Sequence, residues 1–206
     1  MVHGDDNGLV LPPYVAPIQI VVIPVAANKP GVIPAAREVA QKLKDAGYRV
    51  KIDDSDKSAG WKFSEYEMKG VPLRVELGPR DIEKGQVVFA KRNDGQKIFV
   101  SMDEMADKAN ELLKVIHQEM YEKACRYLAN HVTEIKSLDE LNAALEKGGY
   151  AKMMWCGDRA CEDKIKELTN ATARCIPFNQ MGIEGADTCP VCGKKASKVV
   201  LFAKAY

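Results

Sequence analysis

The sequence has no hydrophobic run long enough to cross a membrane. Its longest apolar stretch, residues 18–27, is interrupted by Gln19 and Pro24, whereas a membrane-spanning helix needs about 20 apolar residues. The first residues show neither a basic start nor an apolar leader, so secretion is not expected. We therefore expect a cytoplasmic protein that binds no membrane.

The sequence also lacks a strong charge of either sign. Its 30 Lys and Arg residues are balanced by 29 Asp and Glu, which gives a formal net charge of +1. Non-specific binding to nucleic acid depends on excess positive charge, so we expect no DNA-coating function, although a local basic surface is not excluded. The only histidines, His3, His117 and His131, lie in a turn-rich loop and on an expected helix face. No Ser/His/Asp catalytic set is therefore predicted.

The hydrophobic pattern of the first half predicts an α/β domain with a substantially parallel sheet. Its length of 206 residues and its 46% hydrophobic content suffice for one large or two small domains. Residues 1–17 contain Pro12, Pro13 and Pro17 and are expected to be an extended segment. Strands are predicted at residues 18–23, 48–52, 73–77, 87–90 and 98–100, and helices at 32–46 and 61–69. Strands alternating with helices are typical of this class.

The second half predicts a long helix followed by a smaller α/β domain. A capping-box pattern, Ser101-x-x-Glu104, precedes an apolar helical stripe that reaches Tyr127. A second capping box, Ser137-x-x-Glu140, predicts a short helix that ends at Gly148. The remaining expected elements are a helix near residues 160–169 and apolar runs at 150–155, 173–178 and 199–203. We expect two domains joined by the long helix.

Four of the six cysteines form two short-spaced pairs. Cys156 and Cys161 are separated by four residues, and Cys189-Pro-Val-Cys192 is followed by Gly193. Two such pairs are typical of a structural zinc site with four thiolate ligands. Four free buried thiols and a redox dithiol are the less favoured alternatives. The two remaining cysteines are Cys125, with no assigned role, and Cys175, which we expect to be a core thiol or a reserve ligand.

Residues 61–97 combine basic and aromatic side chains. Eight Lys or Arg residues stand against six acidic ones, with Trp61, Phe63 and Tyr66 among them. Recognition of bases in a single-stranded RNA loop uses aromatic or guanidinium planes for stacking and polar groups for the base edges. On composition alone, an amphipathic helix with solvated charges is the favoured interpretation of this stretch.

Several segments of the sequence resemble those of a known protein family. Two segments closely resemble the anticodon-binding domain of prolyl-tRNA synthetase: residues 57–63 (Lys-Ser-Ala-Gly-Trp-Lys-Phe) and residues 67–81 (Glu-Met-Lys-Gly-Val-Pro-Leu-Arg-Val-Glu-Leu-Gly-Pro-Arg-Asp). The resemblance is to the archaeal and eukaryotic type of this enzyme, which carries an extra C-terminal zinc-binding domain. Residues 3–13 resemble the exit from the class II catalytic core of that family, and residues 199–206 resemble its C-terminal end. The resemblance covers essentially the whole chain.

The resemblance divides the chain into three parts and assigns residues to functions. Residues 1–16 would be the exit segment of the catalytic core, 17–115 the anticodon-binding domain, and 116–206 the connecting helix and zinc-binding domain. The partner implied is proline tRNA, tRNA(Pro), whose second and third anticodon bases are guanines. Phe63 would stack on a base, and Glu67, Arg74, Arg80 and Lys97 would face these guanines. Zinc would be held by Cys156, Cys161, Cys189 and Cys192.

The resemblance also implies a larger parent enzyme. The parent would ligate proline to its tRNA with ATP and Mg²⁺ and would be a homodimer through a catalytic domain preceding Met1. This chain alone would be a monomer without catalytic residues, although Tyr206 at the C-terminus would lie near the aminoacylation site of the parent. The alternatives are a stand-alone zinc-containing RNA-binding or interaction module and a free-standing regulatory paralogue.

Overall fold

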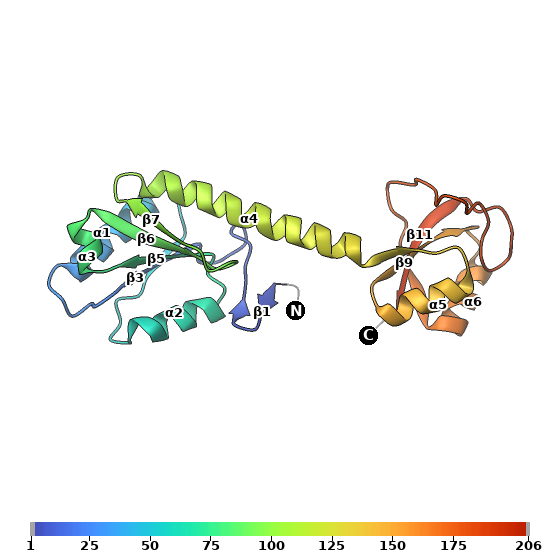
Figure 1. Ribbon diagram of the computed structural model, residues 1–206, viewed down its shortest axis with the longest axis horizontal. Helices are drawn as coiled ribbons and strands as arrows, with labels where there is room; N and C mark the ends of the chain where they lie inside the picture. Colours follow the sequence, from blue (N-terminus) through green and yellow to red (C-terminus); the bar gives the residue numbers. More distant parts are fainter. Residues whose placement is uncertain (1–2, 205–206) are drawn as a thin grey trace. The chain divides into compact units, whose positions relative to one another are not determined.

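The computed structural model describes residues 3–204, which form two compact units of mixed α/β structure (Figure 1). The first unit extends to Lys123 and the second begins at Ala124. The α/β class predicted from the sequence is confirmed, with a sheet and at least two helices in each unit. The finer division into three segments stays a prediction. In the described part of the chain, no helix is long and apolar enough to cross a membrane.

A five-stranded mixed sheet forms the centre of the first unit. β3 pairs in parallel with both β4 and β5, while β5, β6 and β7 pair antiparallel. In spatial order the strands are β4 (Val50–Ile52), β3 (Ile20–Pro24), β5 (Leu73–Leu77), β6 (Gln86–Lys91) and β7 (Lys97–Ser101). The last two strands form the hairpin that the Asn93-Asp94-Gly95 turn predicts.

The helices of the first unit cover the two faces of this sheet unequally. α1 (Val32–Asp45) and the first part of α4 (Met105–Asn130) pack on one face and form the main core, which includes Leu43, Phe89 and Ile116. α2 (Ala59–Met68) packs on the other face, where Tyr66 meets Val21 and Ile23 of β3. At the β7 end of this second face Phe99 is exposed, so the α2 side of the sheet is partly open to solvent.

The helix boundaries in this unit follow from local hydrogen bonds. α2 begins two residues before its predicted start because the Ser58 hydroxyl accepts from the Trp61 amide. The short helix α3 (Pro79–Glu83), which the sequence analysis did not predict, forms because the Asp81 carboxylate accepts from the Gly78 amide at 2.9 Å. The capping box predicted at Ser101 does not form, since Ser101 ends β7 and its hydroxyl accepts from the Asp103 amide.

The segment before the sheet is more ordered than the extended linker that its prolines predict. β1 (Gly4–Asp5) and β2 (Gly8–Leu9) form a small hairpin. Arg92 donates two hydrogen bonds to the Asp5 carboxylate, at 2.8 and 2.7 Å. Gly70, with φ of 71°, lies so near Leu9 that an added Cβ would come within 2.6 Å of the Leu9 Cβ. The hairpin therefore packs directly on the rest of the first unit.

Up to residue 204, the second unit contains the end of α4, a four-stranded sheet and two further helices. Its strands lie in the order β10 (Ala171–Cys175), β11 (Lys198–Lys204), β9 (Tyr150–Trp155) and β8 (Val132–Glu134). α5 (Leu138–Lys147) and α6 (Arg159–Thr169) contribute Leu141 and Ile165 to the core with Phe202. The predicted cap at Ser137 is confirmed, because its hydroxyl accepts from the Glu140 amide, whereas β8 was not predicted.

Candidate nucleic-acid interface and metal centre

Arg74 lies at the centre of a charged cluster on the α2 side of the first sheet. Its guanidinium carbon is 4.2 Å from the ring centroid of Phe63, which projects from α2. Its Nη1 donates to Glu67 Oε1 at 3.0 Å, and its Nε and Nη2 donate to Glu76 Oε1 at 3.1 and 3.0 Å. Two carboxylates and an aromatic ring therefore fix the orientation of this guanidinium.

Lys97 reaches the same cluster from β7. Its Nζ lies 2.8 Å from Glu76 Oε2 and 5.7 Å from the Phe63 ring centroid. The strand register explains this meeting, because Arg74 pairs with Ala90 on β6, and Ala90 pairs with Lys97. Residues directly opposite one another project from the same face of a sheet. The structure thus brings together four of the five residues predicted to contact RNA.

Glu76 is a member of this cluster that the sequence analysis missed. The residue is only 8% exposed, yet its two carboxylate oxygens bind both Arg74 and Lys97. A buried carboxylate needs such cationic partners to offset its lost hydration. Its position could have been read from the alternation along β5, which places Arg74 and Glu76 on one face.

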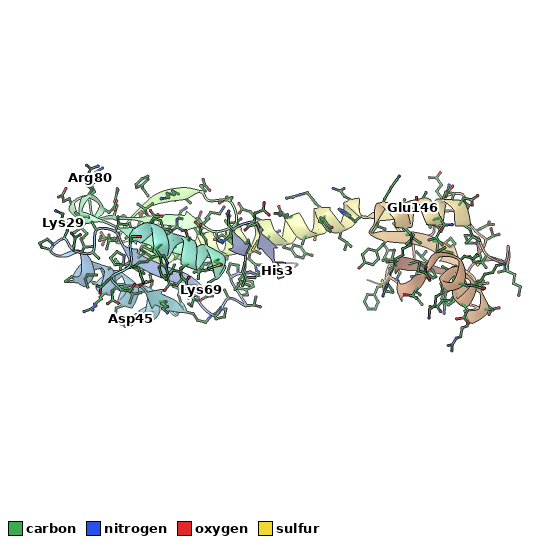
Figure 2. All side chains as sticks on the ribbon, turned by 90° about the horizontal axis from the view of Figure 1, so that it is seen from below. His3, Lys29, Asp45, Lys69, Arg80 and Glu146 are labelled. Carbon is green, nitrogen blue, oxygen red and sulfur yellow. The ribbon has the colours of Figure 1, made fainter. Side chains whose placement is uncertain are left out.

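Arg80, the fifth predicted residue, does not join the cluster. It lies on α3, beyond the end of β5, and its side chain is exposed. Figure 2 shows this side chain extending outward from the ribbon. No hydrogen bond or ion pair of the Arg80 side chain is found among residues 3–204.

A buried lysine holds the start of α2 in place. Lys62 is 1% exposed, and its Nζ donates to the carbonyl oxygens of Asp53 and Ser55 at 2.9 and 2.7 Å. Its charge is also 3.7 Å from Asp53 Oδ1. These contacts tie the loop after β4 to the helix turn that carries Phe63, so the Phe63 ring is held on a rigid element.

A polar cavity of about 310 Å³ opens beside Glu67 and Arg74. Its charged groups are paired, because Arg92 binds Asp5 and the buried Lys91 Nζ binds Asp94 at 2.7 Å. The hydrogen bonds from Arg92 lower the pKa of the Asp5 carboxyl to about 2. Burial acts to lower the pKa of Lys91, but its hydrogen bonds to Asp94 and Glu119 outweigh burial and raise it.

The second unit gathers the four paired cysteines into one cluster. Cys156 follows β9, and Cys161 lies in the first turn of α6, which Asp158 caps through the Ala160 amide. Cys189 and Cys192 lie on a turn that ends at Gly193, whose φ is 69°. All four sulfur atoms lie within 4.8 Å of one another. Two local loops, distant in sequence, thus meet at one point.

The sulfur distances fit a tetrahedral metal site. Cys156 Sγ lies 3.6 Å from Cys161 Sγ and 3.7 Å from Cys192 Sγ. Four thiolates at about 2.3 Å from a tetrahedral zinc would lie about 3.8 Å apart, whereas a disulfide would need about 2.05 Å. The cysteines are all free thiols in the structure. The cluster can therefore hold one metal ion.

The environments of these thiols differ. Burial raises the pKa of Cys161 and of Cys156. Burial acts in the same direction on Cys189, but backbone hydrogen bonds outweigh it and bring the pKa of that thiol to about 7. Cys125 and Cys175 lie outside the cluster and are both exposed, so the expectation of a core thiol at Cys175 is wrong.

Comparison with known proteins identifies both units. Residues 19–112 match the family model of an anticodon-binding domain, and residues 138–206 match that of the prolyl-tRNA synthetase C-terminal region. Over its whole length the chain is 53% identical to a proline–tRNA ligase of Lachnospira eligens and 51% identical to those of Clostridium botulinum and Lachnoclostridium phytofermentans. The chain combines the anticodon-binding and C-terminal domains of the prolyl-tRNA synthetase family.

The two candidate sites fall into different domains of this family. Phe63, Glu67, Arg74 and Lys97 lie within the anticodon-binding match, and all four clustered cysteines lie within the C-terminal match. The chain spans 43% of the length of these prolyl-tRNA synthetase relatives. The relatives are bacterial, so the domain arrangement that we associated with archaea and eukaryotes also occurs in bacteria. Tyr206 lies outside the described residues.

Proposed function

We propose that the first unit binds the anticodon loop of proline tRNA through the α2 side of its sheet. The observation that carries this proposal is the Arg74 guanidinium, which lies over Phe63 and is held by Glu67 and Glu76. A guanidinium and a ring fixed in this way offer planes for stacking and donors for a base edge. The match to an anticodon-binding domain supports the RNA partner.

Arg74 retains donors for a guanine. A guanidinium has five N–H groups, and three of its hydrogen bonds are made within the cluster, so about two N–H groups are left for a ligand. Guanine presents O6 and N7 as acceptors, the pair that arginine binds best. These free N–H groups would suit a guanine that lies beside Phe63 with its O6 and N7 edge towards Arg74.

Glu67 provides the complementary acceptor. Its side chain is 41% exposed, in contrast to the 10% of Glu76, so it can exchange part of its contact with Arg74 for a contact with RNA. A carboxylate accepts well from the N1–H and N2–H groups of guanine. Lys97 adds positive charge at the same place, and the exposed Arg80 is free to reach a phosphate or a second base.

The test of this assignment compares two RNAs and one substitution. We expect Glu67→Ala to weaken binding of the proline anticodon stem-loop by about 5- to 100-fold, because a base-edge contact contributes about 1–3 kcal/mol. Binding of a stem-loop whose middle guanine is replaced should change much less. Equal losses for both RNAs, measured by fluorescence anisotropy, would reduce Glu67 to a general surface acid.

We further propose that the four cysteines hold one structural zinc ion. Four sulfur donors at near-tetrahedral spacing suit zinc and leave no open position for a substrate. The bound ion would fasten the loop after β9 to the Cys189–Cys192 turn. One zinc per chain, measured by elemental analysis and lost on Cys156→Ser, supports the assignment, and a metal-free folded protein would oppose it.

As a part of the whole protein, the chain would serve a cytoplasmic proline–tRNA ligase. The curated relatives carry that name and are longer. ATP and Mg²⁺ would be used by the remainder of such an enzyme, which would also supply the homodimer contact. These 206 residues are expected to bind tRNA as a monomer without charging it. Aminoacylation of tRNA by the purified chain would contradict the proposal that these residues bind tRNA without charging it.

The last strand suggests a role for the C-terminus in the whole enzyme. β11 pairs antiparallel with both β9 and β10, which gives the end of the chain a fixed direction. We propose that the residues after it, ending at Tyr206, approach the aminoacylation site. Deletion of residues 205 and 206 from the whole enzyme should then lower tRNA charging with zinc content unchanged. Unaltered kinetics of adenylate formation and charging would leave Tyr206 as an ordinary chain end.

A further inference from the structure

Phe99 is an exposed aromatic residue that the cluster around Arg74 does not use. It lies on β7, the last strand in the order of the first sheet, and is 66% exposed. Its neighbours Ile98 and Val100 face the opposite way and pack in or against the main core. A large aromatic ring on an exposed edge strand is available for a ligand to cover.

The strand register places Phe99 beside the proposed RNA interface. Glu76 pairs with Val88, and Val88 pairs with Phe99, so these three residues form a row across the sheet. The adjacent row consists of Arg74, Ala90 and Lys97. Phe99 is therefore on the same face as the cluster, about 7 Å along β7 from Lys97 and about 10 Å across the sheet from Glu76.

We propose that Phe99 is a second stacking platform, which receives an unpaired base of the same RNA loop that Phe63 and Arg74 bind. This inference rests on the proposed function. Aromatic rings at the surface bind single-stranded RNA by stacking, and they do so with any base because every base has a π-face. A single-stranded loop that enters at Arg74 passes over the small residues Ala90 and Val88 before it reaches Phe99.

The charges around Phe99 favour an anionic ligand such as RNA over a second copy of the sheet edge. β7 carries Lys97 and no acidic side chain. The acid in the same row as Phe99, Glu76, is already paired with two cations. A phosphate that follows a base stacked on Phe99 would therefore meet a cation and no unpaired carboxylate on these two strands.

The experiment uses the proline anticodon stem-loop and variants of the whole 206-residue chain. Phe99→Ala should weaken binding by about 5- to 100-fold, the range expected when one stacked base loses its ring. Phe99→Trp should restore binding, whereas Phe99→Leu, which keeps the apolar volume, should not. Phe178→Ala removes another exposed phenylalanine ring, from the second unit, and is the control. Because Phe99 is exposed, thermal unfolding should be unchanged.

A fluorescent base locates the contact and separates the two proposals. With 2-aminopurine at each loop position in turn, one position should lose its quenching in Phe99→Ala while remaining quenched in Phe63→Ala. If the unaltered chain fails to bind the stem-loop, the proposed function is wrong. If it binds, and Phe63→Ala weakens binding while Phe99→Ala does not, only the role of Phe99 is overturned.

Discussion

The two candidate sites of this chain are built in opposite ways. The cluster around Arg74 takes side chains from α2, β5 and β7, which only the tertiary fold brings together. The cysteine cluster uses two short loops, each of which already carries its pair of sulfur atoms. The first site is thus a product of the fold, whereas the second, with a metal bound, would help to produce the fold.

Loss of the metal site should have the largest effect and should be confined to one unit. We expect Cys189→Ser to abolish zinc binding and to unfold the second unit, because a structural zinc contributes folding energy directly. Elemental analysis and NMR spectra of the two units provide the measurement. Cys175→Ser, at an exposed cysteine outside the cluster, should change neither. RNA binding by the first unit should persist, and its loss would show that the two sites are coupled.

Removal of the central guanidinium should have the next largest effect. Arg74→Ala leaves Glu67 and Glu76 without their shared partner, so binding of the anticodon stem-loop should fall by about 10- to 100-fold. Arg74→Lys should not restore it, since an ammonium cannot replace a planar group that bridges two carboxylates. Arg159→Ala, at a surface arginine of the second unit, is the control. If an anisotropy titration shows that Arg74→Lys binds the stem-loop as tightly as the unaltered chain, recognition of a base edge by Arg74 is contradicted.

A smaller effect is expected when Glu76 loses its charge but keeps its shape. Glu76→Gln weakens the hold on Arg74 and Lys97, so the preference for guanine over adenine at the recognised position should fall by about 3- to 10-fold. Glu76 acts here as a positioning residue, and the guanine-to-adenine affinity ratio is the readout. An unchanged ratio with only a lower melting temperature would assign Glu76 a purely structural role.

The smallest effect concerns the pH dependence of the first unit. The pKa of Asp5 is about 2 in the folded chain, below its ordinary value of 3.8. Its pairing with Arg92 therefore stabilises the fold above the ordinary pKa and is lost as the pH falls towards 2. An NMR titration of the Asp5 carboxyl should give a low pKa, and Arg92→Gln should return it towards 3.8. A normal pKa in the unaltered chain would contradict the pairing.

These differences in construction explain what the sequence could predict. The spacing within each pair, Cys156 with Cys161 and Cys189 with Cys192, is a local property, so the four cysteines of the cluster could be predicted directly from the sequence. The alternating strands and helices of the first half likewise predict the α/β class, because each element has its own hydrophobic period. The short helix α3 escaped prediction, since five residues are too few to show a period.

The cluster around Arg74 could be predicted only in part. Phe63, Glu67, Arg74 and Lys97 came from a resemblance, and nothing local shows that Lys97 on β7 meets Glu76 on β5. That contact depends on β6 lying between the two strands in one specific register. Glu76 itself was passed over, although its alternation with Arg74 was visible, because an acid between hydrophobic residues gives no sign of its partners.

The central claim, that the sheet face reads guanines of an anticodon, is tested most directly by one titration. The purified chain is titrated into three labelled stem-loops: the proline anticodon loop and two versions in which one of its two shared guanines is replaced by adenine. We expect each replacement to weaken binding by about 5- to 100-fold, in line with the loss of one base-specific contact. Equal affinity for all three RNAs would contradict the claim and would leave the cluster as a general RNA-binding surface.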